Sequence, residues 1–186
     1  VISRSSVRTR HSAPFGYIMN YQVRKIHGND WQACHDIQHS GGHPHEGSLW
    51  SEDTWKFIAA NLQDTFVVLE EKSLRVVGYW LGIIQVNTVE YDEKCGQLGC
   101  VALDACVHKD VRHTGVMDQI MQVACDYHEY IYGWTHAENH AALAIQKKWG
   151  FKKGDFIENR YGPGQHGFFV HYDRDSFTQF KRNIFP

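Results

Sequence analysis

The segment VHKDVRHTGVM, from Val107 to Met117, decides the fold of this chain. It continues an almost unbroken apolar run from Leu98, as expected for a strand in the middle of a sheet. Gly115 then opens a helical pattern that continues to about Tyr130. The apolar face of this helix is predicted to contain Val116, Ile120, Met121, Ala124 and Tyr127. A turn that leads from a strand into a helix places backbone N–H groups at the positive helix end, where an anion can bind.

Two further signals follow in a fixed order. Asn139 precedes a helical pattern that ends at Trp149, and asparagine is a preferred N-cap residue. Gly150 suits the left-handed position that ends a helix, and Phe151 begins a strand. The inward face of this helix is predicted to contain Ala142, Ile145 and Trp149. The glycine turn, the helix start at Asn139 and the ending at Gly150 and Phe151, in this order, indicate a particular fold more specifically than a glycine turn alone.

Together these segments resemble the Gcn5-related N-acetyltransferase (GNAT) superfamily, which transfers an acyl group from acyl-coenzyme A to an amine. The predicted order of elements agrees with the topology of that superfamily. Strands are predicted at 21–26, 65–70, 74–86, 98–108, 132–137, 151–159 and 167–172, and helices at 29–39, 51–62, 115–130 and 139–149. We therefore expect an α/β (α+β) fold. It would be a single GNAT-like domain with a mixed sheet of about seven strands, a splayed central strand pair and about four helices.

The first 18 residues differ from the rest of the sequence. Residues 1–18 carry three arginines, several serines and no acidic residue, whereas the sequence from Met19 reads like a natural protein start. We expect 1–18 to be a leader, vector-derived or disordered, with a fragment of a transit peptide as the alternative. Residues 19–186 are then the acyl-CoA N-acyltransferase domain. Removing three positive charges from the net charge of −2 leaves this domain at −5.

Composition excludes several classes of protein. The chain has 186 residues, 42% of them hydrophobic, which is enough for one core. It contains no apolar run of the roughly 18 residues that span a bilayer. A net charge of −2 argues against a nucleic-acid binder with a generally basic surface. It does not exclude a local basic patch. Five cysteines without a CxxC pair indicate free thiols and a cytoplasmic protein.

The resemblance implies acetyl-CoA as cosubstrate and names its binding residues. The strand backbone at Ala105, Cys106 and Val107 would pair with the pantetheine arm and the acyl carbonyl. The pyrophosphate would bind the turn formed by Arg112, His113, Thr114, Gly115, Val116 and Met117, and Asn139 would hold the cofactor arm. Two positions depart from the family pattern. Met117 stands where the family usually has Gly or Ala, and Gln146 stands where it often has a tyrosine that protonates the leaving thiolate.

Amine acylation requires a neutral amine and a donor for the oxyanion. The Val107 N–H is the predicted oxyanion donor. Asp104 is the predicted base because it is the only carboxylate in the central strand and shares a strand face with Cys106. A structural aspartate bonded to backbone is the alternative. Cys106 reads as a small core residue rather than a nucleophile, and His108 is a weaker candidate base.

A histidine-rich segment precedes the second helix. In the resembled fold this region walls the acceptor pocket, so His43, His45, Glu46 and Tyr161 are predicted to contact the acceptor. Further wall candidates are Trp50, Trp55 and His166, although core packing is favoured for Trp55. His35 and His39 have the i, i+4 spacing of a metal chelate, but a solvated segment without a functional metal is expected.

The leading hypothesis is an N-acetyltransferase that moves an acetyl group to a primary amine by direct attack in a ternary complex. The acceptor would be a small-molecule amine or a protein amine, and the resemblance allows a homodimer. The alternative is a catalytically silent acyl-CoA-binding module of the same fold, which Met117 and Gln146 would explain. No partner of nucleic acid or membrane is expected.

Overall fold

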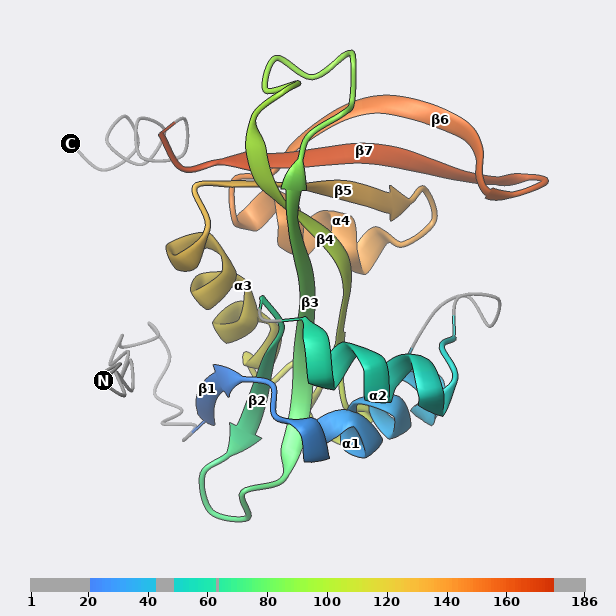
Figure 1. The fold of residues 1–186 in the computed structure, drawn as a ribbon. Coiled ribbons are helices and arrows are strands. Elements are labelled where there is room, and N and C mark those ends of the chain that lie inside the picture. The colour runs from blue at the N-terminus through green and yellow to red at the C-terminus, as the bar shows by residue number, and fades with distance from the viewer. Residues whose placement is uncertain (1–20, 43–48, 63, 176–186) are drawn as a thin grey trace. The chain divides into compact units, whose positions relative to one another are not determined.

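The computed structural model describes residues 21–42, 49–62 and 64–175. Within them it contains four α-helices and a seven-stranded mixed sheet, which confirms the predicted fold class (Figure 1). The strand order is β1-β2-β3-β4-β5-β7-β6. The leader, His43, His45 and Glu46 lie outside the described residues. No helix of the described part is both long enough and apolar enough to cross a membrane.

The bounds of the elements follow the predicted order. The strands are β1 (Tyr21–Lys25), β2 (Phe66–Glu70), β3 (Val76–Val86), β4 (Leu98–Val107), β5 (Tyr130–His136), β6 (Lys152–Gly162) and β7 (Gln165–Asp173). The helices are α1 (Trp31–Ile37), α2 (Glu52–Asn61), α3 (Val116–Tyr127) and α4 (His140–Lys148). Three short turns of helix are η1 (Gly28–Asp30), η2 (Gln38–Gly42) and η4 (Lys109–Val111).

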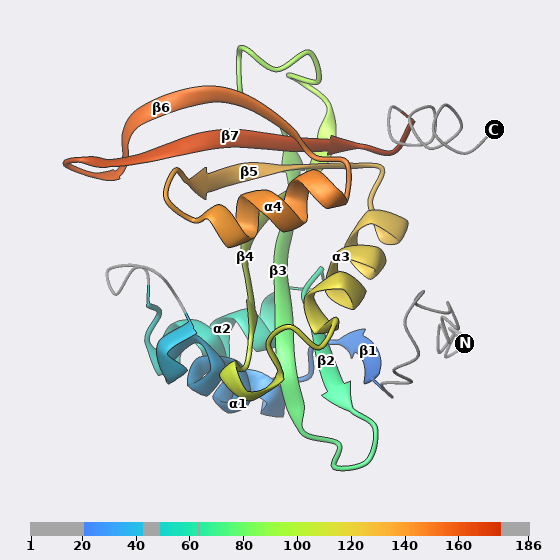
Figure 2. The ribbon, with the colours of Figure 1, turned by 180° about the vertical axis from the view of Figure 1, so that it is seen from behind.

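The chain divides into two compact units. Unit 1 contains the described residues of 1–79 together with 106–120, and unit 2 contains 80–105 together with the described residues from 121 onward. In unit 1, β1 pairs antiparallel with β2, and helices α1 and α2 lie side by side (Figures 1 and 2). Trp55 of α2 is fully buried, and its indole N–H donates to Gln38 Oε1 at 3.1 Å. This confirms the core role expected for Trp55.

Unit 2 is built on antiparallel pairing of β5, β7 and β6. All seven residues of β5 pair with β7, from Tyr130 opposite Asp173 to His136 opposite Gly167. One side of this sheet carries an aromatic core that includes Tyr132 and Phe169. Helix α4 contacts β6, the strand that follows it in the chain, and Figure 2 shows the helix beside β5.

The prediction that the helix after Gly115 extends to Tyr130 is wrong. Helix α3 ends at Tyr127, whose side chain is 55% exposed rather than part of the apolar face. The His128 N–H makes the final helical bond, to the Ala124 carbonyl at 2.9 Å. Tyr130 instead opens β5, where it is buried and its hydroxyl donates to Asp92. Its burial against the sheet outweighs its fit to the helical pattern.

Smaller differences concern turns and burial. Strand β3 begins at Val76 rather than at Leu74, because Leu74 has a φ of 57° in a turn that is closed by Glu70. Strands β6 and β7 extend further into their connecting turn than the predicted bounds of 151–159 and 167–172. The predicted inward residues of α4 are only half-buried, because this short helix covers the sheet without being covered itself. These residues are Ala142, Ile145 and Trp149.

Candidate functional site

Strands β4 and β5 separate part-way along their length. They pair in parallel at three positions, ending at Ala102 opposite Gly133, although β5 continues to His136 and remains paired with β7. A Cβ on Gly133 would lie 2.8 Å from the Ala102 carbonyl oxygen, so glycine is required at this last pair. Beyond Ala102, β4 has no ladder partner on β5 within the described chain. The predicted splayed strand pair is therefore confirmed.

The turn that precedes α3 lies in unit 1 and has two left-handed residues. His113 has a φ of 63° and Gly115 a φ of 89°. The Gln119 N–H donates to the Gly115 carbonyl at 3.1 Å, so the N–H groups of Val116 and Met117 precede the first helical bonds. Left-handed residues next to a helix start form a concave set of N–H groups that suits an anion. The six predicted turn residues, Arg112, His113, Thr114, Gly115, Val116 and Met117, all belong to this segment.

Hydrogen bonds within unit 1 hold this turn in place. The His108 N–H donates to the Val77 carbonyl of β3 at 2.8 Å. The Thr114 hydroxyl donates to the Val111 carbonyl, and the Tyr21 hydroxyl lies 3.3 Å from Thr114 Oγ1. The turn is thus fixed to β1 and β3 before any ligand is present, which lowers the entropic cost of binding.

The later helix begins and ends as predicted. The Asn139 side-chain oxygen accepts a hydrogen bond from the Ala142 N–H at 3.0 Å, which makes Asn139 the N-cap of α4. Gly150 has a φ of 81°, and the Phe151 N–H donates to the Gln146 carbonyl at 3.0 Å in a Schellman-type ending. The cap uses the oxygen of Asn139, so its amide N–H groups can donate to a ligand.

Gln146 has a partner that the sequence did not indicate. Its amide nitrogen donates to the Thr135 hydroxyl of β5 at 2.8 Å, and that hydroxyl lies 3.1 Å from the Gln146 amide oxygen. Thr135 is buried. The packing of α4 against β5 brings these two residues together, and no local sequence pattern predicts this contact. The pair places a hydroxyl and an amide side by side on the helix-covered face of β5.

The predicted base and the neighbouring cysteine have different surroundings. Asp104 is half-buried on β4, and strand alternation puts it on the face of Ala102, opposite to Val101. Val101 belongs to the aromatic core with Tyr132. Cys106 is 5% exposed, which agrees with a core residue, and none of the five cysteines forms a disulfide in the described chain.

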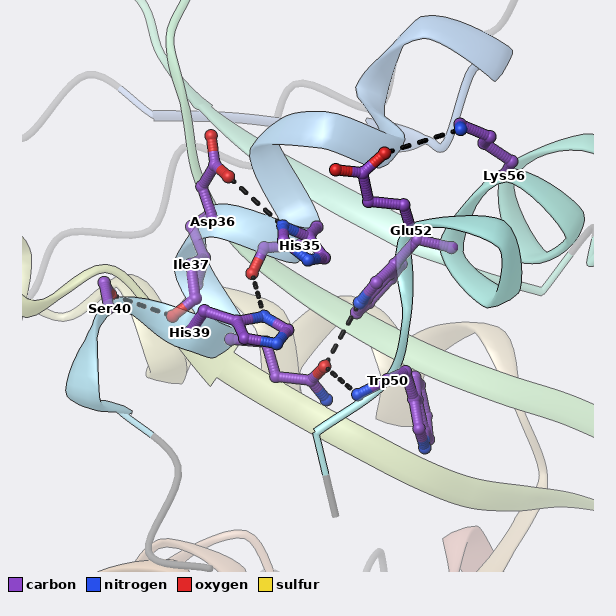
Figure 3. A network of polar contacts seen from close by, with 10 residues as sticks. His35, Asp36, Ile37, His39, Ser40, Trp50, Glu52 and Lys56 are labelled. Atoms are coloured by element: carbon purple, nitrogen blue, oxygen red, sulfur yellow. Dashed lines mark hydrogen bonds and ion pairs between the residues drawn. The ribbon is translucent and has the colours of Figure 1, made fainter. Parts of the chain in front are cut away.

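The histidine-rich segment forms a small hydrogen-bonded network (Figure 3). The His39 Nδ1 lies 2.9 Å from the His35 carbonyl oxygen, so His39 donates through Nδ1. The His35 Nδ1 lies 3.2 Å from Asp36 Oδ1, and the two imidazole rings are stacked with centroids 4.0 Å apart. Among the described residues, no group of three or more His, Cys, Asp or Glu side chains is placed to hold a metal ion.

Two other predicted wall residues have local partners. The Trp50 N–H donates to Gln38 Oε1 at 2.9 Å. The His166 ring packs against Phe156 with centroids 5.1 Å apart, and its Nδ1 accepts a hydrogen bond from the Asn159 N–H at 3.3 Å. The His166 side chain therefore holds the β6–β7 hairpin, whereas the Trp50 contact uses only its backbone N–H.

Tyr161 belongs to a group of four side chains in unit 2 that we call the aromatic–arginine cluster. Its members are Trp134 and His136 of β5 and Arg160 and Tyr161 of β6. The Arg160 guanidinium lies over the Trp134 ring at 4.4 Å, and the Tyr161 and His136 rings are 5.4 Å apart. Burial raises the pKa of Tyr161, and the positive charge of Arg160 partly opposes this rise. The sequence predicted only Tyr161, because Arg160 and Trp134 are brought together by strand order.

Comparison with solved structures identifies the fold. The ribosomal-protein-S18-alanine N-acetyltransferase of Escherichia coli matches with a TM-score of 0.62 and 13% identity, over 83% of this chain and 94% of that chain. Arabidopsis thaliana NAA60 in complex with a bisubstrate analogue matches with a TM-score of 0.69 and 14% identity, over 83% and 98%. A GNAT-family acetyltransferase of Bacillus anthracis matches with a TM-score of 0.64 and 12% identity, over 83% and 95%.

The chain has the GNAT fold. The structural matches cover nearly the whole of the compared acetyltransferases. No protein-family model matches the sequence, and no curated protein matches it either. The assignment of the fold therefore rests on three-dimensional likeness.

Proposed function

We propose that this protein is an acetyl-CoA-dependent N-acetyltransferase that acts on a primary amine in a ternary complex. The observation that carries the proposal is the left-handed pair His113 and Gly115 at the start of α3. Such a turn supplies several N–H donors to a pyrophosphate. Arabidopsis NAA60 has been solved in complex with acetyl-CoA on the same fold, which supports acetyl-CoA as the cosubstrate here.

The proposed cofactor contacts are mainly backbone groups. The N–H groups of the turn from Arg112 to Met117 would hold the pyrophosphate. The edge of β4 at Ala105, Cys106 and Val107 would pair with the pantetheine arm, as an extended peptide pairs with a strand. Asn139 would donate its amide N–H groups to the same arm. Backbone contacts depend little on which side chains are present, which agrees with the low sequence identity to the solved acetyltransferases.

The proposed reaction is direct acyl transfer. The neutral amine attacks the thioester carbon, a C–N bond forms, the C–S bond breaks, and coenzyme A leaves as a thiolate. The Val107 N–H would stabilise the oxyanion, and Asp104 is the candidate base. Thr135 would hold the Gln146 amide, whose second N–H would donate a hydrogen bond to the leaving sulfur in place of an acidic side chain. A thiolate is a fair leaving group, so hydrogen bonding without full protonation is sufficient.

A peptide amine is the acceptor that the comparisons favour. The E. coli structure is named for acetylating an alanine of ribosomal protein S18, and a NatC complex was solved with a Gag peptide and CoA. His43, His45, Glu46 and Tyr161 remain proposed acceptor contacts. A small-molecule amine is the alternative acceptor.

An acetyl-transfer assay tests the proposal with two matched variants. Gly115→Glu places a negative charge in the turn, and Gly96→Glu repeats the same change at a φ of 84° with open space around it. Both variants carry the same backbone strain. With a panel of peptide and small-molecule amines, we expect turnover by the native protein and by Gly96→Glu. We expect a loss of roughly 100-fold or more for Gly115→Glu.

A silent acyl-CoA-binding module is the second candidate. The observation that favours it is the Gln146–Thr135 pair, which has no acidic proton at neutral pH. Acetyl-CoA binding without turnover on any amine of the panel would support this reading and contradict the enzymatic one.

A further inference from the structure

We propose that Arg160 selects an acceptor amine that carries a carboxylate group. This inference rests on the proposed acetyltransferase function and specifies the substrate class of that site. It starts from the aromatic–arginine cluster, which the fold builds from two strands that are not neighbours. Strand β7 lies between β5 and β6 in the sheet.

A glycine lets the cluster form. A Cβ on Gly167 of β7 would lie 2.9 Å from the Tyr161 ring and 3.3 Å from two side-chain carbons of Arg160. Gly167 is also the residue that pairs with His136. Arg160 and Tyr161 therefore lie across the bare backbone of Gly167 and reach Trp134 and His136 on β5. Any larger residue at 167 would push them away.

The guanidinium of Arg160 contacts aromatic rings and has no acidic partner in the described chain. It lies over the Trp134 ring at 4.4 Å, and no carboxylate among the described residues lies within ion-pair distance of it. Stacking occupies the flat face of a guanidinium and leaves the N–H groups around its edge to donate. A planar fork of N–H groups held in this way matches a carboxylate, which can accept two parallel hydrogen bonds.

The cluster lies where the two central strands separate. Trp134 directly follows Gly133, the last β5 residue that pairs with β4. Its side chain is on the face of Tyr132, whereas Thr135 and its partner Gln146 are on the other face. An acceptor that approaches the open strand edge from the Tyr132 face would meet Arg160. The Gln146 face, which also carries Asp104, would remain for the thiol end of the cosubstrate, and the amine would reach Asp104 through the opening between β4 and β5.

The carboxylate can come from two sources, which the assay separates. One is the α-carboxylate of a free amino acid, and the other is an Asp or Glu side chain near the N-terminus of a peptide. The test compares kcat/KM for matched acceptors: free amino acids against their amides, and peptides with Glu or Gln at the second position. If only the free amino acids have a higher kcat/KM than their neutral partners, Arg160 binds the α-carboxylate. If only the Glu peptides do, Arg160 binds the peptide side chain.

The variants are Arg160→Gln and the control Lys153→Gln. Lys153 is also on β6 and also lies over an aromatic ring, Phe168, at 4.0 Å, but it is outside the cluster. We expect the native protein to prefer the carboxylate-bearing acceptor by about tenfold, the effect of one charge-assisted bidentate contact. The preference should disappear in Arg160→Gln, with a kcat/KM ratio of about one, and should persist in Lys153→Gln.

Acetyl-CoA affinity is measured on the same variants. An unchanged Kd in Arg160→Gln is expected, and a weaker Kd would overturn the proposal by assigning Arg160 to the cosubstrate. Equal kcat/KM for the acidic and neutral acceptors in the native protein would also overturn it, while leaving the acetyltransferase function intact. If no acceptor of any kind is acetylated, the proposed function itself fails, and the carboxylate inference fails with it.

Discussion

Two arginines of this protein are used in opposite ways. Arg24 of β1 donates to both oxygens of Asp30, at 2.6 and 2.8 Å, and also to the Lys25 carbonyl. Arg160 of β6 lies over the Trp134 ring and has no acidic partner in the described chain. Three hydrogen bonds join Arg24 to its own unit, whereas no hydrogen bond or ion pair within the described chain uses Arg160. The difference separates an arginine that stabilises a unit from one that is placed to bind.

The pKa of Asp30 shows the effect of its contact with Arg24. Burial alone would raise the pKa of Asp30, but hydrogen bonds from Arg24 and from the His27 N–H outweigh it and lower the pKa below its ordinary value. A carboxyl with a lowered folded-state pKa stabilises the protein above its unfolded-state pKa. That stabilisation is lost as the pH falls through the folded-state value.

The largest stability effect is therefore expected for Asp30→Asn. The amide puts N–H groups against the donors of Arg24 and His27 and leaves the guanidinium partly buried without its charge partner. We expect a loss of about 2 kcal/mol in the free energy of unfolding at neutral pH. Urea unfolding followed from neutral pH to below about pH 4 should show a smaller acid-dependent decline than in the native protein. An unchanged decline would mean that Asp30 is not the group responsible.

A second change perturbs the strand beside Trp134 without touching either arginine. Gly133→Ala puts a Cβ 2.8 Å from the Ala102 carbonyl oxygen. Because backbone must move to relieve this contact, we expect a loss of about 1 kcal/mol, the low end of the range for an overpacked site, in thermal or urea unfolding. Gly28→Ala is the control, since a Cβ there meets nothing within 4 Å. Equal stability of the two variants would show that the close approach of β4 and β5 is not tight in solution.

The smallest stability effect is expected for Arg160→Gln. It removes a cation–π contact at a surface strand, for which a loss of roughly 0.5–1 kcal/mol is typical. Urea unfolding of this variant beside Asp30→Asn tests the comparison directly. If Arg160→Gln costs as much as Asp30→Asn, then Arg160 has a structural role like that of Arg24, and the contrast between the two is wrong.

The parts of the site that the sequence predicted are those that local rules encode. The left-handed Gly115, the Asn139 cap and the Gly150 helix ending each depend on residues within a few positions of one another. The end of α3 was missed because Tyr127 and Tyr130 both fit a helical pattern, and only tertiary burial distinguishes them. Burial depends on packing partners that a single sequence does not show.

The aromatic–arginine cluster could not be predicted for a related reason. Arg160 and Trp134 meet because β7 inserts between β5 and β6 and because Gly167 leaves room across it. The sequence indicates that all three strands exist but not their order. The Gln146–Thr135 pair has the same origin, since it joins a helix to a strand through their packing.

Calorimetric titration of the protein with acetyl-CoA tests the central claim most directly. The account predicts one site with a micromolar Kd, about −8 kcal/mol in binding free energy. It also predicts that Gly115→Glu abolishes the binding heat, whereas Gly96→Glu retains it. Absence of binding by the native protein, or equal binding by both variants, would contradict the assignment of the turn from Arg112 to Met117 as the cofactor site.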